Sequence, residues 1–216
     1  MENREILVSG ARLLGVSLDA SQAAAFERFL DELTRWNQRM NLTAFREKRS
    51  IIIRHFLDSL TVVRYLPETI NLLDLGSGAG FPGIPLKIAK PRFQVVLLDG
   101  SRKRTYFQKH VIRSLDLSGI RSVWGRSDWV EIREALGNSF DVVVSRAVSS
   151  LEVYLGQAIH FIPEGGMIIA MRGRDVSVPI RPESLSLRLD KTVSTDLPFE
   201  GIRRTLQFFR KTTLSV

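Results

Sequence analysis

The sequence predicts an α/β fold: a mostly parallel, seven-stranded sheet with helices on both faces and a helical segment before it. Two observations predict this fold. Short apolar runs alternate with helical patterns from residue 71 onward, which is typical of a buried parallel sheet. A glycine-rich turn follows the first apolar run, at the place where a doubly wound sheet brings its backbone close to a ligand.

The first 70 residues predict a helical cap. A short helix is expected over residues 4–15, and a second helix begins near Ser21, a suitable N-cap residue. Apolar residues then recur at three- and four-residue spacing between residues 26 and 40, which indicates a core-facing stripe. A third helix is expected over residues 50–66, because Pro67 ends the pattern.

Strands and helices alternate after the cap. The expected strands are 71–75, 93–98, 120–124, 140–144 and 167–172, and the expected helices are 82–90, 103–117, 128–136 and 151–162. Residues 185–197 and 205–211 alternate apolar and polar positions, as a terminal strand pair would. We therefore expect a cap over 1–70 and one compact ligand-binding domain over 71–216.

Composition limits the possible functions. The 216 residues include no cysteine, which excludes disulfides and thiolate metal sites. No apolar run approaches the roughly 20 residues that cross a bilayer, so we expect a cytoplasmic protein with no membrane partner. Of the net charge of +8, most lies in residues 71–126, which hold ten Lys/Arg and three Asp/Glu. This predicts a polyanionic substrate; the alternative is a solvated basic face.

The glycine-rich turn fits two kinds of ligand. The segment 71–86 reads NLLDLGSGAGFPGIPL. Gly78, Gly80 and Gly83 match the dinucleotide pattern G-x-G-x-x-G. However, Gly76 occupies the place directly after the strand, and Asp74 precedes it by two residues. This D-x-G-x-G-x-G form resembles the S-adenosylmethionine (AdoMet) loop of class I methyltransferases, in which Asp74 would serve the cofactor's ammonium group, directly or through the loop. A tight turn without a ligand is the third possibility.

Polar residues stand where the next strands end. Asp99 follows the second strand and can bind both ribose hydroxyls, which NAD and AdoMet both require. Ser127 and Asp128 follow the third strand and can bind an adenine edge, although Asp128 could equally be an N-cap. Arg146 follows the fourth strand, opposite the transferred group, unless it is a buried structural arginine.

Taken together, several segments resemble one family. They are Asn41-Leu42-Thr43, Arg54-His55-x-x-Asp58-Ser59, the block from Asp74 to Leu86, Leu98-Asp99, Lys103-Arg104 and Ser145-Arg146-Ala147. In this order and spacing they resemble the RsmG family, also called glucose-inhibited division protein B, from about residue 26 to 175. The resemblance implies a Rossmann-like, class I AdoMet-dependent methyltransferase that modifies guanine N7 in 16S ribosomal RNA.

The resemblance also implies site residues. Those predicted to bind the cofactor are Asp74, Gly76, Gly78, Gly80, Phe81, Asp99, Ser127, Asp128 and Arg146. Those predicted to bind the substrate are Asn41, Ser59, Lys103, Arg104 and Arg172. Arg172 stands in Met171-Arg172-Gly173, where family members usually have Leu-Lys-Gly, so the charge is kept but the donor geometry differs.

We assign catalytic roles to Arg146, Asp58 and His55 as hypotheses. Guanine N7 carries a free lone pair, so no general base, metal or nucleophilic side chain is needed and positioning is the main contribution. Asp58 would stabilise the cationic product, and Arg146 would hold the base or the cofactor carboxylate. His55 and Asp58 are three residues apart on a predicted helix, so their side chains can meet.

The expected partner is ribosomal RNA or the small ribosomal subunit, bound by a monomer without a metal ion. Arginines and lysines around residues 102–113 would contact phosphates. The main alternative is an AdoMet-dependent methyltransferase with a different RNA, protein or small-molecule acceptor. A nicotinamide-dependent oxidoreductase and a non-catalytic RNA-binding domain are further alternatives.

Overall fold

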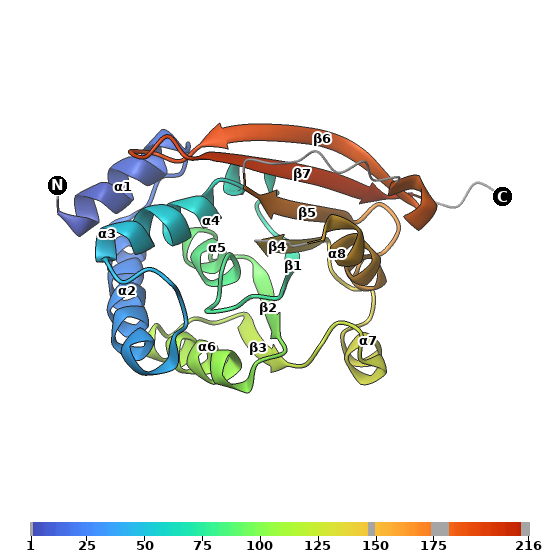
Figure 1. Ribbon diagram of the computed structural model, residues 1–216, viewed down its shortest axis with the longest axis horizontal. Coiled ribbons are helices and arrows are strands. Elements are labelled where there is room, and N and C mark those ends of the chain that lie inside the picture. Colours follow the sequence, from blue (N-terminus) through green and yellow to red (C-terminus); the bar gives the residue numbers. More distant parts are fainter. Residues whose placement is uncertain (1, 147–149, 174–181, 213–216) are drawn as a thin grey trace.

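A seven-stranded sheet forms the centre of the computed structural model, which describes residues 2–146, 150–173 and 182–212 (Figure 1). Its order is β3-β2-β1-β4-β5-β7-β6. The strands are β1 Asn71–Leu75, β2 Gln94–Asp99, β3 Ile120–Trp124, β4 Val142–Arg146, β5 Met167–Arg172, β6 Leu187–Asp196 and β7 Arg203–Lys211. The first five are parallel, and β7 pairs antiparallel with β5 and β6. The predicted fold class is confirmed, including the terminal strand pair.

The apolar strands bury both of their faces. Leu72 in β1 belongs to one apolar cluster and Leu73 to another, because successive side chains point to opposite faces of a strand. Figure 1 shows α7 and α8 on one face and α2, α5 and α6 on the other. These helices are α2 Ala20–Met40, α5 Gly83–Ala89, α6 Arg102–Ser114, α7 Val130–Leu136 and α8 Leu151–Ala158. Within the described ranges, no helix is long and apolar enough to cross a membrane.

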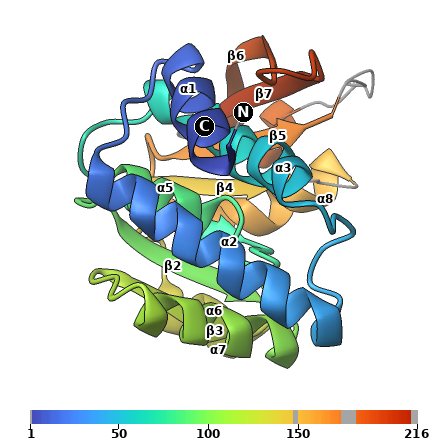
Figure 2. The ribbon, with the colours of Figure 1, turned by 90° about the vertical axis from the view of Figure 1, so that its left-hand side faces the viewer.

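The cap joins the sheet through aromatic rings. Phe29 of α2 is fully buried. Its ring lies 5.3 Å from those of Phe56 and Phe81 and 6.4 Å from that of Phe107, measured between centroids. These rings come from the cap, the glycine turn and α6, which α2 crosses in Figure 2. Cap and sheet thus share one apolar cluster, while the predicted division at residue 70 stays a prediction.

The start of α2 differs from the prediction. Asp19, not Ser21, is the N-cap residue: its carboxylate accepts from the Gln22 backbone N–H at 2.8 Å. The Gln22 side chain accepts in turn from the Asp19 backbone N–H at 2.9 Å. This reciprocal capping box satisfies two free backbone donors, whereas Ser21 donates its hydroxyl to Asp19.

The predicted helix over 50–66 is confirmed in part: residues 48–60 form one uninterrupted helical run, but it is not α-helical throughout and it ends before residue 66. The chain forms α3 Lys48–Ile51, a π-helical segment Ile52–Leu57, α4 Asp58–Leu60 and a 3-10 turn Val63–Tyr65. α1 Asn3–Leu13 packs against the π-helical segment. π-helical turns are wider than α-helical ones and often occur at functional sites. Here that segment carries His55, whose Nδ1 accepts from the Arg146 guanidinium.

Replacing Phe29 with Ala should lower the free energy of unfolding by about 3–5 kcal/mol, because a buried aromatic side chain leaves a cavity among rings that cannot all close in. Urea unfolding followed by circular dichroism would measure this. Leu13→Ala is the matched control: Leu13 is 70% exposed, so its removal should change stability by less than about 0.5 kcal/mol. Equal effects of the two substitutions would contradict the role given to Phe29.

Candidate active site

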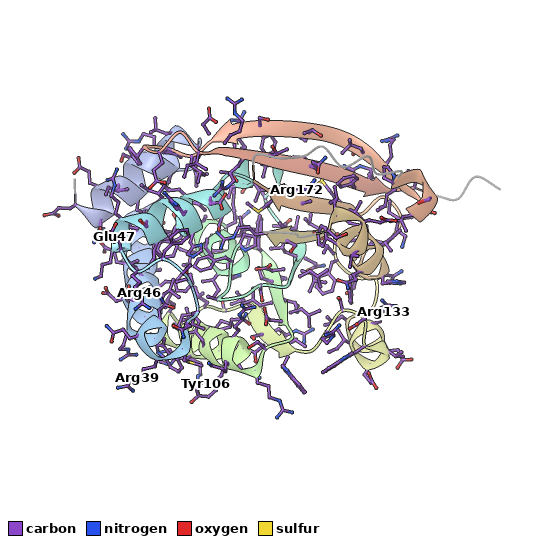
Figure 3. The ribbon with its side chains drawn as sticks, viewed as in Figure 1. Arg39, Arg46, Glu47, Tyr106, Arg133 and Arg172 are labelled. Carbon is purple, nitrogen blue, oxygen red and sulfur yellow. The ribbon has the colours of Figure 1, made fainter. Side chains whose placement is uncertain are left out.

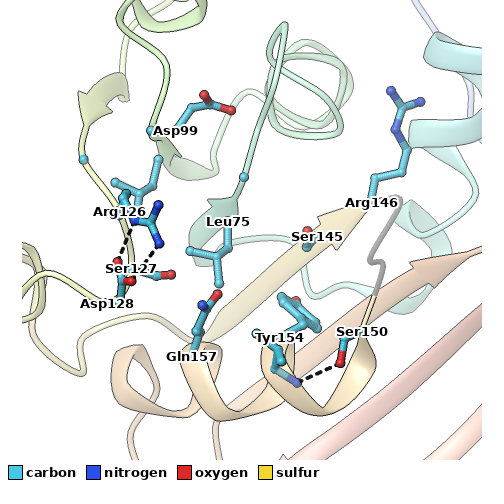
Figure 4. Close-up of a pocket in the computed structure, with 15 residues that line it drawn as sticks. Leu75, Asp99, Arg126, Ser127, Asp128, Ser145, Arg146, Ser150, Tyr154 and Gln157 are labelled. Atoms are coloured by element: carbon cyan, nitrogen blue, oxygen red, sulfur yellow. Dashed lines mark hydrogen bonds and ion pairs between the residues drawn. The ribbon is translucent and has the colours of Figure 1, made fainter. Parts of the chain in front are cut away.

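A cavity of about 360 Å³ lies at the carboxyl ends of β1, β2, β3 and β4 (Figure 4). Parallel sheets of this topology bind ligands at this edge. Its lining residues are Leu75, Gly76, Leu98, Asp99, Gly100, Gly125, Arg126, Ser127, Asp128, Ser145, Arg146, Ser150, Val153, Tyr154 and Gln157. Five predicted cofactor residues are therefore brought together here, from four different strand ends: Gly76, Asp99, Ser127, Asp128 and Arg146.

The glycines of the turn serve two purposes. Gly76 and Gly78 have φ values of +75° and +58°, and a Cβ built on either would meet no atom within 4 Å. They are needed for the left-handed backbone conformation, and they leave open space beside the loop. A Cβ on Gly83 would instead lie 2.8 Å from Asp74 Oδ2 and 2.3 Å from Leu97. Gly83 thus allows α5 to pack closely on the sheet.

Asp74 is fully buried and supports the loop from below. Its Oδ2 accepts from the Gly83 backbone N–H at 2.7 Å. Its Oδ1 has no hydrogen-bond partner in the described part of the chain. Burial raises the pKa of Asp74 to about 7, although the Gly83 hydrogen bond and the Arg146 charge oppose this shift. Asp74 does not line the cavity, so the structure places it beneath the loop and away from the cavity surface.

Asp99 fixes the position of the glycine loop. Its Oδ2 accepts from the Gly78 backbone N–H and its Oδ1 from the Ser101 backbone N–H, both at 2.8 Å. Gln108, which sequence reasoning missed, donates from Nε2 to Ser77 Oγ at 2.9 Å and to the Gly78 carbonyl at 2.7 Å. The loop is therefore held from both β2 and α6, while Asp99 also lines the cavity.

The loop after β3 contributes a charged pair. Arg126 donates from Nε and Nη2 to the two carboxylate oxygens of Asp128, at 3.0 and 2.9 Å. This pairing lowers the pKa of Asp128. The N-cap of α7 is Trp129, so the alternative role of Asp128 as an N-cap is excluded. Arg126 itself was not predicted, because a loop arginine carries no motif.

Arg146 connects the strand ends to the cap. Its guanidinium donates to the Arg54 carbonyl at 3.0 Å, to Asp58 Oδ2 at 3.4 Å and to His55 Nδ1 at 2.8 Å. It also lies 5.0 Å from the centroid of the Phe81 ring. His55 and Asp58 therefore meet at Arg146. Phe81 has a buried ring stacked on His55, so the structure gives it a supporting place behind the cavity.

His55 has both ring nitrogens engaged. Since a guanidinium only donates, Nδ1 accepts from Arg146 and the proton lies on Nε2, which pairs with Thr43 Oγ1 at 2.6 Å. Burial and the Arg146 charge lower the pKa of His55 to about 3. His55 is thus neutral at physiological pH and orients Arg146; it has no free nitrogen to accept a proton.

A second cavity of about 300 Å³ lies between the cap and β5. Its lining residues are Phe45, Arg54, His55, Asp58, Arg146, Met171, Arg172, Gly173, Arg204 and Leu206. Arg146 lines both cavities. Arg172, labelled at the end of β5 in Figure 3, has a buried Nη1 without a hydrogen-bond partner among the described residues. Its predicted place at a substrate site therefore fits this cavity.

The other predicted substrate residues lie elsewhere. Asn41 is the left-handed C-cap of α2, and Ser59 is fully buried, with its hydroxyl donating to the His55 carbonyl. Ser59 therefore has no exposed surface for a substrate. Lys103 and Arg104 are exposed on α6, where Arg104 lies 3.7 Å from Asp99. Ala147, part of the quoted motif, lies outside the described residues.

Arg204 of β7 is the main site residue that sequence reasoning missed. It donates from Nε to Asp58 Oδ1 at 3.0 Å, opposite Arg146. The strand alternation predicted β7, but nothing in the sequence connects residue 204 with residue 58. Within the described ranges, no group of three His, Cys, Asp or Glu residues could hold a metal ion.

Comparisons with known proteins agree with this geometry. The family model for rRNA small subunit methyltransferase G matches residues 22–206. The ribosomal RNA small subunit methyltransferase G of Acetivibrio thermocellus is 38% identical over 213 residues, which cover 96% of this chain and 88% of the relative. The protein of that name from Geobacter metallireducens is 38% identical over 210 residues, covering 95% and 94%.

Solved structures show a similar fold. The crystal structure of M. jannaschii TYW2 in complex with AdoMet has a TM-score of 0.57 at 16% identity, covering 71% of this chain and 74% of that one. A SAM-dependent methyltransferase from Aquifex aeolicus has a TM-score of 0.55 at 14% identity, covering 74% and 92%. At these identities the likeness concerns the fold, which is that of class I AdoMet-dependent methyltransferases.

The raised pKa of Asp74 predicts a pH-dependent stability. Its value of about 7 exceeds the 3.8 of an ordinary aspartate, so between these pH values the folded state binds more protons than the unfolded state. Stability should therefore fall as pH rises from about 4 to 7, by up to about 4 kcal/mol. Asp74→Asn, which cannot ionise, should lack this component. Urea unfolding of both proteins from pH 4 to 8 would measure it, and a pH-independent difference between them would contradict it.

Proposed function

The chain belongs to the rRNA small subunit methyltransferase G family, and from that premise we propose that it transfers the methyl group of AdoMet to N7 of a guanine in 16S ribosomal RNA. One observation of the structure supports this above others: two cavities adjoin, and Arg146 lines both. Methyl transfer requires a donor and an acceptor held in contact. A cytoplasmic location and a monomeric state belong to the same proposal.

The first cavity fits AdoMet. When bound, AdoMet supplies an electrophilic methyl group on its sulfonium centre. Asp74 does not line this cavity, so its carboxylate would favour the cofactor's ammonium group through the loop that it supports. Asp99 keeps lone pairs for ribose hydroxyls after accepting two backbone N–H groups. Ser127 and Asp128 line the remaining end of the cavity, where an adenine would lie. Because AdoMet carries no phosphate, the glycine loop needs no phosphate-binding group.

The second cavity fits a purine base. Phe45, Met171 and Leu206 supply apolar surface, and Arg172 offers a guanidinium donor without a partner in the described chain. Guanine O6 accepts hydrogen bonds, so Arg172 is our candidate for recognising that atom. A target base that leaves its stack to enter such a pocket has precedent in enzymes that modify nucleobases.

Methyl transfer to guanine N7 requires side chains that position the reactants and stabilise charge. The N7 lone pair lies in the ring plane and needs no deprotonation, which agrees with a His55 that has no free nitrogen. The methylated guanine gains positive charge. Asp58 carries a buried carboxylate at the edge of the second cavity, where its field favours that charge. We therefore assign Asp58 and Arg146 to electrostatic and positioning roles.

The direct test is methyl transfer from labelled AdoMet to small ribosomal subunits that lack the modification, followed by nucleoside analysis. We expect the label in 7-methylguanosine. Label in another nucleoside would retain the methyltransferase and overturn the N7 assignment. No label in RNA, with AdoMet binding confirmed by calorimetry, would favour the alternative of a different acceptor.

Arg146→Ala should lower kcat/KM for subunit methylation about a hundredfold or more, because a preorganised guanidinium between donor and acceptor is lost. The measurement is initial rate against subunit concentration. Arg188→Ala is the matched control: Arg188 is 66% exposed by side chain and pairs with Asp190 on β6, so its loss should leave the rate within about twofold. Retention of full activity by Arg146→Ala would refute the assigned role.

A further inference from the structure

Exposed aromatic side chains gather at the β3 edge of the sheet. The exposed large apolar side chains among the described residues include Tyr106 at 60%, Trp124 at 37% and Trp129 at 36%. All three lie on α6, β3 or the loop that follows β3. An exposed aromatic patch on a charged surface often marks an interaction site. None of these side chains takes part in the site described above.

The three aromatic residues are arranged around one basic helix face. Arg102 lies over the Trp124 ring at 4.2 Å from its centroid, and Trp124 and Trp129 meet edge-on at 5.3 Å between centroids. Arg102, Tyr106 and Lys109 follow one another at four- and three-residue spacing on α6, so they share a helix face. Figure 3 shows Tyr106 on the outer side of this helix. We call Arg102, Tyr106, Lys109, Trp124 and Trp129 the aromatic–basic strip.

The strip adjoins the cofactor cavity at one end. Trp124 Nε1 donates to the Gly100 carbonyl at 3.0 Å, and Gly100 lines that cavity together with the Gly125–Asp128 loop between the two tryptophans. At the other end, Tyr106 and Lys109 line a shallow groove with Arg113 and Arg121. The strip thus extends from the rim of the cofactor cavity along the sheet edge.

Its charge is almost entirely positive. Residues 100–128 contain seven Lys/Arg and two acidic residues: Asp116, which lies beyond the end of α6, and Asp128, which is paired with Arg126. A surface that combines exposed aromatic faces with cations suits single-stranded nucleic acid, because unstacked bases pack on the rings while phosphates meet the cations. A duplex hides its base faces and would meet only the cations.

We propose that the aromatic–basic strip binds unpaired nucleotides of the ribosomal RNA at the β3 edge, away from the target guanine in the second cavity, by stacking bases on Trp124, Trp129 and Tyr106. This inference rests on the proposed function and adds to it a surface outside both cavities. Stacking there would hold a more distant part of the RNA strand while the target base occupies the second cavity. It would raise RNA affinity without taking part in methyl transfer.

The test measures RNA binding and methylation separately. Binding of a 12-nucleotide single-stranded RNA containing guanine, and of the same sequence as a duplex, is followed by fluorescence anisotropy and by tryptophan quenching. The variants are Trp124→Ala with Trp129→Ala, Tyr106→Ala, and Trp129→Phe. Leu189→Ala on β6 is the control, because Leu189 is 42% exposed and β6 forms the opposite edge of the sheet.

We expect the double tryptophan variant to bind the single strand about ten- to a hundredfold more weakly and Tyr106→Ala about fivefold or more. Trp129→Phe keeps a ring and should stay within about threefold, as should Leu189→Ala. The KM for the small subunit should rise in the same order. The kcat at saturating RNA, the Kd for AdoMet and the duplex affinity should change less than about threefold.

The proposal and the proposed function can fail independently. If the wild-type protein methylates ribosomal RNA while Tyr106→Ala and the double variant keep single-strand affinity and KM, the strip is not a stacking surface and the methyltransferase assignment stands. If the wild-type protein puts no methyl group into RNA, the proposed function fails. If the double variant also loses AdoMet affinity, its weaker RNA binding cannot be assigned to lost stacking. The Tyr106→Ala variant then decides whether the strip binds RNA, because Tyr106 does not line the cofactor cavity.

Discussion

The candidate site depends on the interactions of one buried carboxylate, that of Asp58, with two arginines. Asp58 is 3% exposed, and an unpaired charge at such depth would be strongly destabilising. Arg146 from β4 and Arg204 from β7 each hold one of its oxygens, at 3.4 and 3.0 Å. Cap, sheet and terminal hairpin must therefore meet at one point for the fold to be stable. Arg146 at this point lines both cavities, while Asp58 and Arg204 line the second.

The glycine loop shows a second constraint, in which support and ligand binding share the same side chains. Asp99 accepts a hydrogen bond from the backbone N–H of Gly78 in the loop, and Asp74 accepts one from the backbone N–H of Gly83 in the following helix. These bonds fix the loop in the absence of a ligand. The pKa of Asp74 lies at about 7, so its protonated and ionised forms are both populated near neutral pH. A cation bound on the other side of the loop would favour the ionised form, which would couple ligand binding to the protonation state of Asp74.

Local patterns predicted most of the fold because its strands are buried on both faces and its turns carry glycine or proline. The five parallel strands and the terminal pair were predicted within two or three residues. The cap helix over 50–66 was predicted in part: its π-helical segment was not predicted, because its apolar spacing is similar to that of an α-helix. Motif residues at strand ends, such as Asp99 and Arg146, line the cavity at that edge. Ser59 is buried, which a motif position does not reveal, and its substrate role stays a prediction.

Arg204 shows why the rest of the candidate site could not be predicted from the sequence. Its contact with Asp58 spans 146 positions in sequence, and it depends on β7 lying antiparallel beside β5. A second contact of the hairpin region acts alongside it, since Glu200 accepts from Arg54 Nε at 2.8 Å, one residue before His55. The hairpin thus contacts both sides of the segment that orients Arg146. A region whose sequence shows only strand alternation therefore lines the second cavity, because the sheet topology places it there.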